Sequence, residues 1–80
     1  MYICVGKSEF GFCAVKKAVR FVVGKHFYEI VEEGSERYLV TPENRKIRVK
    51  GFTINTDIVV VITEEPLDGW AICKRVEELG

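Results

Sequence analysis

The feature that most constrains this fold is a turn sequence, Thr41-Pro42-Glu43-Asn44-Arg45, set between two runs in which apolar and polar residues alternate. Pro42 suits the second position of a type I turn, and Asn44 tolerates the left-handed backbone conformation of a following bulge. A three-residue loop of this kind pairs Thr41 with Arg45, and the rest of the register follows from that pair. The segment therefore predicts an antiparallel β-hairpin.

The predicted register divides the hairpin into two faces, because successive side chains of a strand point to opposite sides of the sheet. The first face is apolar enough for a core, through Leu39, Ile47 and Val49. The second face carries a tyrosine among cations. We expect these pairs: Arg37 with Val49, Tyr38 with Arg48, Leu39 with Ile47, and Val40 with Lys46. The residues of the second face that we predict to bind nucleic acid are Tyr38, Lys46, Arg48 and Lys50.

An aromatic ring among cations is the way in which sheet surfaces stack bases and hold a phosphate backbone. The alternative is a solvated face whose lysines protect a sheet edge, in which Tyr38 and Arg48 form an ordinary cross-strand pair. The chain carries twelve basic and twelve acidic residues, so its formal net charge is zero. That balance argues against a protein that coats nucleic acid without specificity.

The remaining segments predict further strands and two helices. Ser8 is a good N-cap and Gly24 a good C-terminal cap, which predicts a helix over 8–23. The run from Ile58 to Ile62 is apolar at every position, which predicts a central strand with both faces covered or nearly covered. A final helix is expected over 63–79, and further strands over 2–5, 26–33, 37–41 and 45–50.

These elements predict one α+β domain spanning residues 1–80, in the order β-α-β-β-β-β-α. The simplest architecture is a two-layer sandwich, with two helices on a mostly antiparallel sheet of four to five strands. The apolar arc of the first helix is about twice as wide as the ~100° that a surface helix needs. We therefore expect it to form a homodimer interface, unless the sheet and the last helix cover it. The interface residues predicted on this helix are Phe12, Val15, Val19 and Val23.

The cysteines number three, and none is spaced as Cys-x-x-Cys. An odd count does not suit a disulfide framework, and a zinc site made by one chain lacks its ligand pattern. We therefore expect Cys4, Cys13 and Cys73 to be small buried apolar residues. A reactive thiol at Cys13 is a more distant alternative, because Lys16 and its basic neighbours could favour the thiolate.

The sequence contains no pattern for a catalytic site, a metal or a cofactor. Its longest apolar run is far too short to span a bilayer, and its start lacks the features of a signal peptide, so we expect a cytoplasmic protein with no membrane contact. The absence of Gln and the excess of Glu over Asp are typical of hyperthermophile proteins. The sequence therefore predicts a non-enzymatic module that self-associates or binds a protein partner, with RNA or DNA as the alternative ligand.

Overall fold

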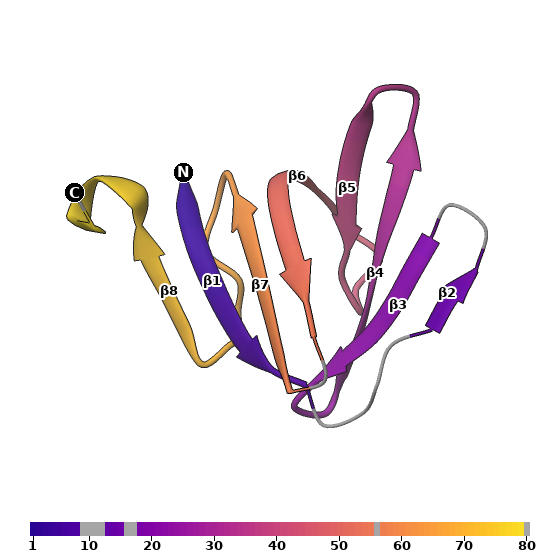
Figure 1. The fold of residues 1–80 in the computed structure, drawn as a ribbon, viewed down its shortest axis with the longest axis horizontal. Helices are drawn as coiled ribbons and strands as arrows, with labels where there is room; N and C mark the ends of the chain where they lie inside the picture. The colour runs from indigo at the N-terminus through magenta and orange to yellow at the C-terminus, as the bar shows by residue number, and fades with distance from the viewer. Residues whose placement is uncertain (9–12, 16–17, 56, 80) are drawn as a thin grey trace.

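The computed structural model describes residues 1–8, 13–15, 18–55 and 57–79, which form one eight-stranded antiparallel sheet. The strands lie in the order β2-β3-β4-β5-β6-β7-β1-β8, so β1 alone leaves its place in the chain and enters between β7 and β8 (Figure 1). The described ranges contain no α-helix. The elements are β1 (Tyr2–Lys7), β2 (Cys13–Val15), β3 (Ala18–Val23), β4 (His26–Glu33), β5 (Glu36–Val40), β6 (Lys46–Ile54), β7 (Ile58–Thr63), β8 (Ile72–Arg75) and a 3₁₀ turn, η1 (Val76–Leu79).

The predicted α+β sandwich is therefore wrong, because strands occupy the described parts of the first predicted helix. The segment 18–23 is rich in valine, and it alternates between an exposed Arg20 and a buried Phe21 as a strand does. Gly24 has a φ of 63°, as a helix cap would require, but it begins a two-residue turn that joins β3 to β4. The positive φ of this glycine is therefore compatible with a helix cap and with a hairpin turn. Residues 9–12 and 16–17 of the predicted helix lie outside the described residues.

The second predicted helix is also wrong. Residues 64–71 form a loop between β7 and β8, and only the 3₁₀ turn at the end of the chain is helical. The buried hydroxyl of Thr63 donates a hydrogen bond to the Glu65 carbonyl at 2.6 Å, which holds the start of the loop. Gly69 then adopts a φ of 83°, a left-handed conformation that interrupts a helix.

The predicted hairpin is confirmed in detail. Thr41 and Arg45 are joined by a backbone hydrogen bond of 2.9 Å, and Asn44 has the predicted positive φ, at 66°. All four predicted pairs between β5 and β6 are present. The strand predicted over 26–33 has the same bounds as β4.

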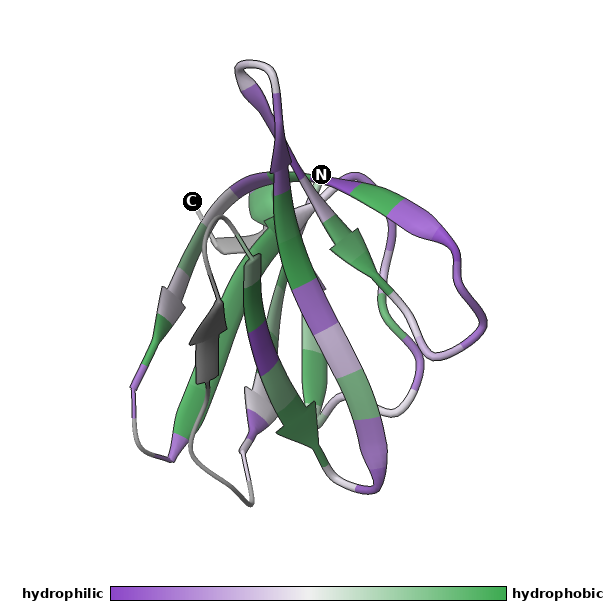
Figure 2. Cartoon of the chain, turned by 90° about the vertical axis from the view of Figure 1, so that its right-hand side faces the viewer, coloured by the Kyte–Doolittle hydropathy of each residue, from purple (hydrophilic) through white to green (hydrophobic). Residues whose placement is uncertain are grey.

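The sheet curls so that strands distant in its order meet at one end. Ser8, next to β1, forms an isolated bridge with Val23 of β3, although four strands separate β1 from β3. The strands converge at the lower end of Figure 1 and spread apart at the upper end. Figure 2 shows from the side how the sheet bends around its inner face. The core is therefore the concave side of one curved sheet rather than a layer between sheet and helices.

The loop between β7 and β8 covers this concave side. Trp70, in the loop, is only 8% exposed, and its ring packs edge-on against Phe21 and Tyr28, with centroids 6.2 and 5.5 Å away. Gly6 admits the indole, because a Cβ there would lie 2.8 Å from Trp70 Cε3. The buried apolar core consists of Cys4, Phe21, Val23, Tyr28, Ile30, Leu39, Ile47, Val49, Val59, Val61, Leu67 and Trp70.

Candidate functional site

The four residues predicted to bind nucleic acid come from the hairpin strands β5 and β6. Tyr38 is half-buried, and the three cations are exposed. The Lys46 ammonium lies 5.9 Å from the centroid of the Tyr38 ring, and Arg48 is the direct cross-strand partner of Tyr38. Lys50 follows on the same strand, at the register irregularity between Val49 and Gly51. The structure thus places the aromatic ring next to cations, as the register predicts.

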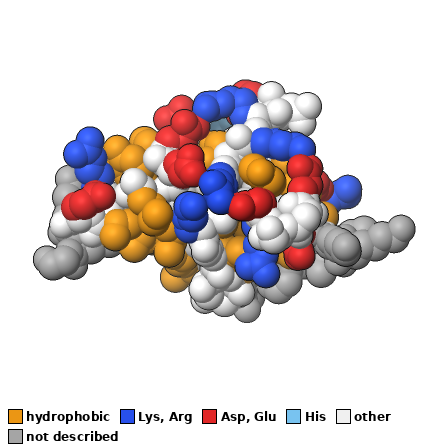
Figure 3. Space-filling view, turned by 90° about the horizontal axis from the view of Figure 1, so that it is seen from above, with side chains coloured by type: hydrophobic (Ala, Val, Ile, Leu, Met, Phe, Trp, Pro, Cys, Tyr) orange, Lys and Arg blue, Asp and Glu red, His pale blue; other side chains and the backbone are white. Residues whose placement is uncertain are grey.

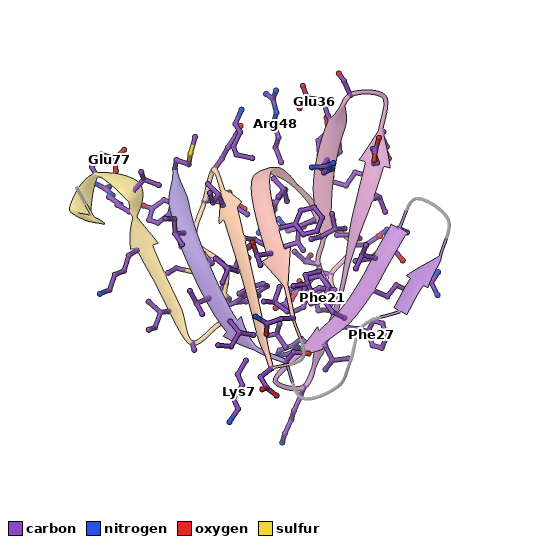
Figure 4. The ribbon with its side chains drawn as sticks, in the orientation of Figure 1. Lys7, Phe21, Phe27, Glu36, Arg48 and Glu77 are labelled. Atoms are coloured by element: carbon purple, nitrogen blue, oxygen red, sulfur yellow. A yellow bond between two sulfur atoms is a disulfide. The ribbon has the colours of Figure 1, made fainter. Side chains whose placement is uncertain are left out.

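Carboxylates from the neighbouring hairpin turn neutralise two of these cations. Arg48 makes two hydrogen bonds to Glu36, of 2.7 and 2.8 Å, and the two side chains lie close together in Figure 4. Hydrogen bonding to Glu36 raises the pKa of the Arg48 guanidinium. Lys46 forms an ion pair with Glu33. Any phosphate that approached this face would compete with carboxylates already bound to its cations.

The four predicted interface residues do not share a helix face. Phe12 lies outside the described residues, and Val15 belongs to β2. Val19 is half-buried on β3, while Val23 is a core residue beside Gly6. The argument from the width of a helical arc therefore fails for these residues.

A different apolar surface lies on the outer side of β7, β1 and β8. Here Ile3 pairs with Ile62, and Val5 pairs with both Val60 and Ile72, so their side chains share the face opposite the core. Ile58 is 42% exposed and Ile72 is 50% exposed. In Figure 3 hydrophobic atoms gather in the left half of the molecule, with a few charged side chains at its left end and most of the charged side chains toward its centre and right. We call this surface the apolar outer face, made of Ile3, Val5, Ile58, Val60, Ile62 and Ile72.

The apolar outer face explains why β7 is apolar at every position. The strand lies inside the sheet as predicted, and its inward residues Val59 and Val61 are fully buried. Its outward residues are only half-buried or exposed, so the expectation that both faces are covered is wrong for the outer one. The continuous apolar run 58–62 indicated an apolar strand in the sequence, but it did not show that β1 and β8 would extend the surface.

A cleft of about 330 Å³ lies between the loop after β7 and the turn between β5 and β6. An ion pair between Arg45 and Glu65 spans these two segments. The Tyr28 hydroxyl donates a hydrogen bond of 3.2 Å to the Asp68 carbonyl, and burial raises the pKa of Tyr28. The neighbouring Trp70 indole opposes this rise in the pKa of Tyr28. The buried Nε1 of that indole has no hydrogen-bond partner among the described residues.

This cleft offers charged and hydrogen-bonding groups, but their arrangement does not define a reaction. Hydrogen bonds from its own backbone N–H and from the Thr41 hydroxyl lower the pKa of Glu43. His26 also lines the cleft. Across the parts of the chain that the structure describes, no group of three or more His, Cys, Asp or Glu side chains could hold a metal ion.

The expectation that all three cysteines are unpaired is wrong. Cys4 and Cys73 form a disulfide, with their Cα atoms 4.1 Å apart. They are directly opposite each other on β1 and β8, so the bond joins strands from the two ends of the chain. Cys13 belongs to β2, and its side chain lies outside the description.

Two findings bear on what kind of protein this is. Within the described residues, no helix is long and apolar enough to cross a bilayer. Comparison with protein-family models, curated proteins and solved structures gave no match.

Proposed function

We propose that this chain is a small non-enzymatic interaction module that binds a protein surface through the apolar outer face. The observation that carries the proposal is the alignment of six aliphatic side chains on three adjacent strands, on the side away from the core. Removing apolar surface from water contributes about 25 cal/mol per Å². A partner that covered this face would gain that free energy without disturbing the core.

The size of the face supports a specific interaction. Three strands at a spacing of about 4.8 Å and six residues at about 3.3 Å cover roughly 300 Å² in projection. Contiguous exposed patches of about 300–600 Å² are the largest on typical monomers and often have a function. β-Branched side chains on this outer face also lose little rotamer freedom on binding, because their χ1 angles are already restricted.

We further propose a cytoplasmic location. A disulfide is unusual in the cytosol of mesophiles, but intracellular proteins of hyperthermophiles are often rich in disulfides. The Cys4–Cys73 disulfide and the scarcity of amide side chains therefore both support an intracellular protein of a hyperthermophile.

Photo-crosslinking tests this interaction. A benzophenone amino acid placed at Ile58 or Ile72 is expected to form adducts with one and the same protein surface in cells that make the protein, identified by mass spectrometry of the linked peptides. The same group at Phe27, which is 61% exposed on β4, is the matched control and is expected to give none of those peptides. Absence of adducts at both test positions would contradict the proposed function.

Nucleic acid is the second candidate ligand, favoured by the position of Lys46 and Arg48 around Tyr38. We expect single- and double-stranded RNA and DNA to bind with Kd above ~100 μM at ~200 mM salt, because Glu33 and Glu36 occupy these cations. Fluorescence anisotropy at ~50 and ~200 mM salt measures this. Micromolar binding that is lost in Arg48→Ala would instead make the hairpin face the functional site.

A further inference from the structure

We infer that the partner of the apolar outer face is a second copy of this chain, related by a two-fold axis that runs parallel to the strands between β7 and β1. This inference rests on the proposed function, and it adds the identity of the partner. In this arrangement two sheets pack face to face, about 10 Å apart. The strand β7 of one copy then faces β1 of the other, and β8 faces β6 of the other.

The sizes of the side chains favour this axis. On β8 the outward residues are Ile72 and Lys74, and Ile72 stands half out of the surface. On β6 the outward residues at the same levels are Gly51 and Thr53, which pair with Ile62 and Val60. The two-fold axis therefore places the protruding Ile72 on β8 of one copy over the smaller side chains on β6 of the other. In the centre, aliphatic side chains of β1 meet aliphatic side chains of β7.

The charges at the lower end of the face are complementary across the same axis. Lys7 pairs with Ile58 in the sheet, and it extends beyond the end of β1 (Figure 4). Asp57 is exposed and immediately precedes Ile58 at that end. Since the axis exchanges the positions of β1 and β7, it brings the end of β1 that carries Lys7 in each copy opposite the end of β7 that follows Asp57 in the other. A symmetric dimer would therefore contain two such contacts.

The available area is enough for a dimer of modest affinity. The outer sides of β6, β7, β1 and β8 cover roughly 400 Å² in projection, by the strand spacing and rise used above. Side chains that stand on the sheet add their own flanks to this area. Small specific interfaces bury about 600 Å² from each partner. That is about a ninth of the 5362 Å² accessible surface of the chain. We therefore expect a dissociation constant in the micromolar range.

The first experiment measures the mass of the oxidised protein by sedimentation equilibrium from ~10 to ~500 μM. The wild-type mass is expected to double across this range. Ile72→Lys is expected to weaken the dimer at least 10-fold, because it places a charge where β8 of one copy packs on β6 of the other, whereas the matched variant Phe27→Lys is expected to dimerise as the wild type does. A wild-type monomer at ~500 μM overturns the inference, as does equal dimerisation by Ile72→Lys.

The second experiment tests the axis by charge reversal. Lys7→Glu alone and Asp57→Lys alone are each expected to weaken self-association about 10-fold, because like charges then meet twice in each dimer. An equimolar mixture of the two variants is expected to regain wild-type affinity, because both contacts of the mixed dimer are again opposite in sign. An intrachain effect gives no such recovery on mixing, so a mixture no tighter than its components overturns the inferred axis.

The two proposals fail separately. A monomeric protein whose positions 58 and 72 crosslink to a different protein in cells retains the proposed function and overturns the second copy as partner. A monomeric protein without adducts at either position overturns both. Adducts to the chain's own β1, β7 or β6 peptides, together with the mass doubling, support both.

Discussion

Replacing Trp70 with alanine is expected to lower the free energy of unfolding by about 3–5 kcal/mol, the range measured for large aromatic residues removed from cores. Trp70 is only 8% exposed although it lies in a loop. Its ring contacts Phe21 and Tyr28 edge-on and covers the Cα of Gly6. Its loss therefore leaves a cavity on the concave face, lined by β3 and β4 on one flank and by β1 on the other. The sheet has no helical layer within the described ranges that could move in to fill this space.

Urea unfolding followed by far-ultraviolet circular dichroism measures this loss, since the variant has no tryptophan fluorescence. Trp70→Phe is expected to lose clearly less stability, because it keeps an aromatic ring in the site and because the indole Nε1 has no hydrogen-bond partner in the described structure. Phe27→Ala is the matched control at an exposed aromatic residue, and it is expected to change stability by less than about 0.5 kcal/mol. A Trp70→Ala variant within 1 kcal/mol of the wild type would show that the loop does not close the core.

The hairpin between β5 and β6 could be predicted from the sequence because its information is local. Pro42 and Asn44 determine the turn, and one pair then fixes the register of every other pair. The chain supports this with apolar residues on one face, so that a slip by one position would expose Leu39 and Ile47.

The two helices were predicted wrongly because the local sequence of each segment is compatible both with a helix and with another structure. In the segment 18–23 nearly every residue is apolar, so a helical period and a strand period both find support. Pairing with β4 decides between them: Phe21 lies opposite Tyr28, and the two rings stack at 5.8 Å. That partner is chosen by the fold as a whole and not by the segment itself. Similarly, the sequence around Pro66 and Trp70 fits an amphipathic helix. In the structure this segment is a loop, because the indole of Trp70 packs against the concave side of the sheet.

The candidate site could be predicted only in part, because it depends on the order of the strands. The outward residues of β7 were visible in the sequence as a continuous apolar run. Their neighbours Ile3 and Val5 join them only because β1 enters between β7 and β8. Lys46 and Arg48 lie beside Tyr38 as the register predicts, but Glu33 at the end of β4 and Glu36 at the start of β5 form ion pairs with them.

Removing the Cys4–Cys73 disulfide is expected to lower the free energy of unfolding by about 4 kcal/mol. The two cysteines are 69 residues apart in sequence. Closing a loop of that length removes much conformational entropy from the unfolded chain, and the chain-entropy relation gives about 4 kcal/mol at 25 °C. Domains of this size have a total stability of only about 4–12 kcal/mol, so the loss is a large fraction of it.

The loss is also expected to weaken the interface, because β8 is an edge strand, and among the described strands it pairs with β1 alone. Without the covalent bond, β8 is held there by its four register pairs, the packing of Cys73 and a hydrogen bond from the Val76 N–H to the Met1 carbonyl. The variant with both Cys4→Ala and Cys73→Ala should therefore unfold at lower urea and dimerise more weakly, since Ile72 belongs to β8. Cys13→Ser is the matched control, because it removes a cysteine and keeps the Cys4–Cys73 disulfide. Titration of the native oxidised protein with a thiol reagent should find one free thiol per chain; three free thiols would show that the bond does not form, and unchanged stability of the double variant would contradict its role.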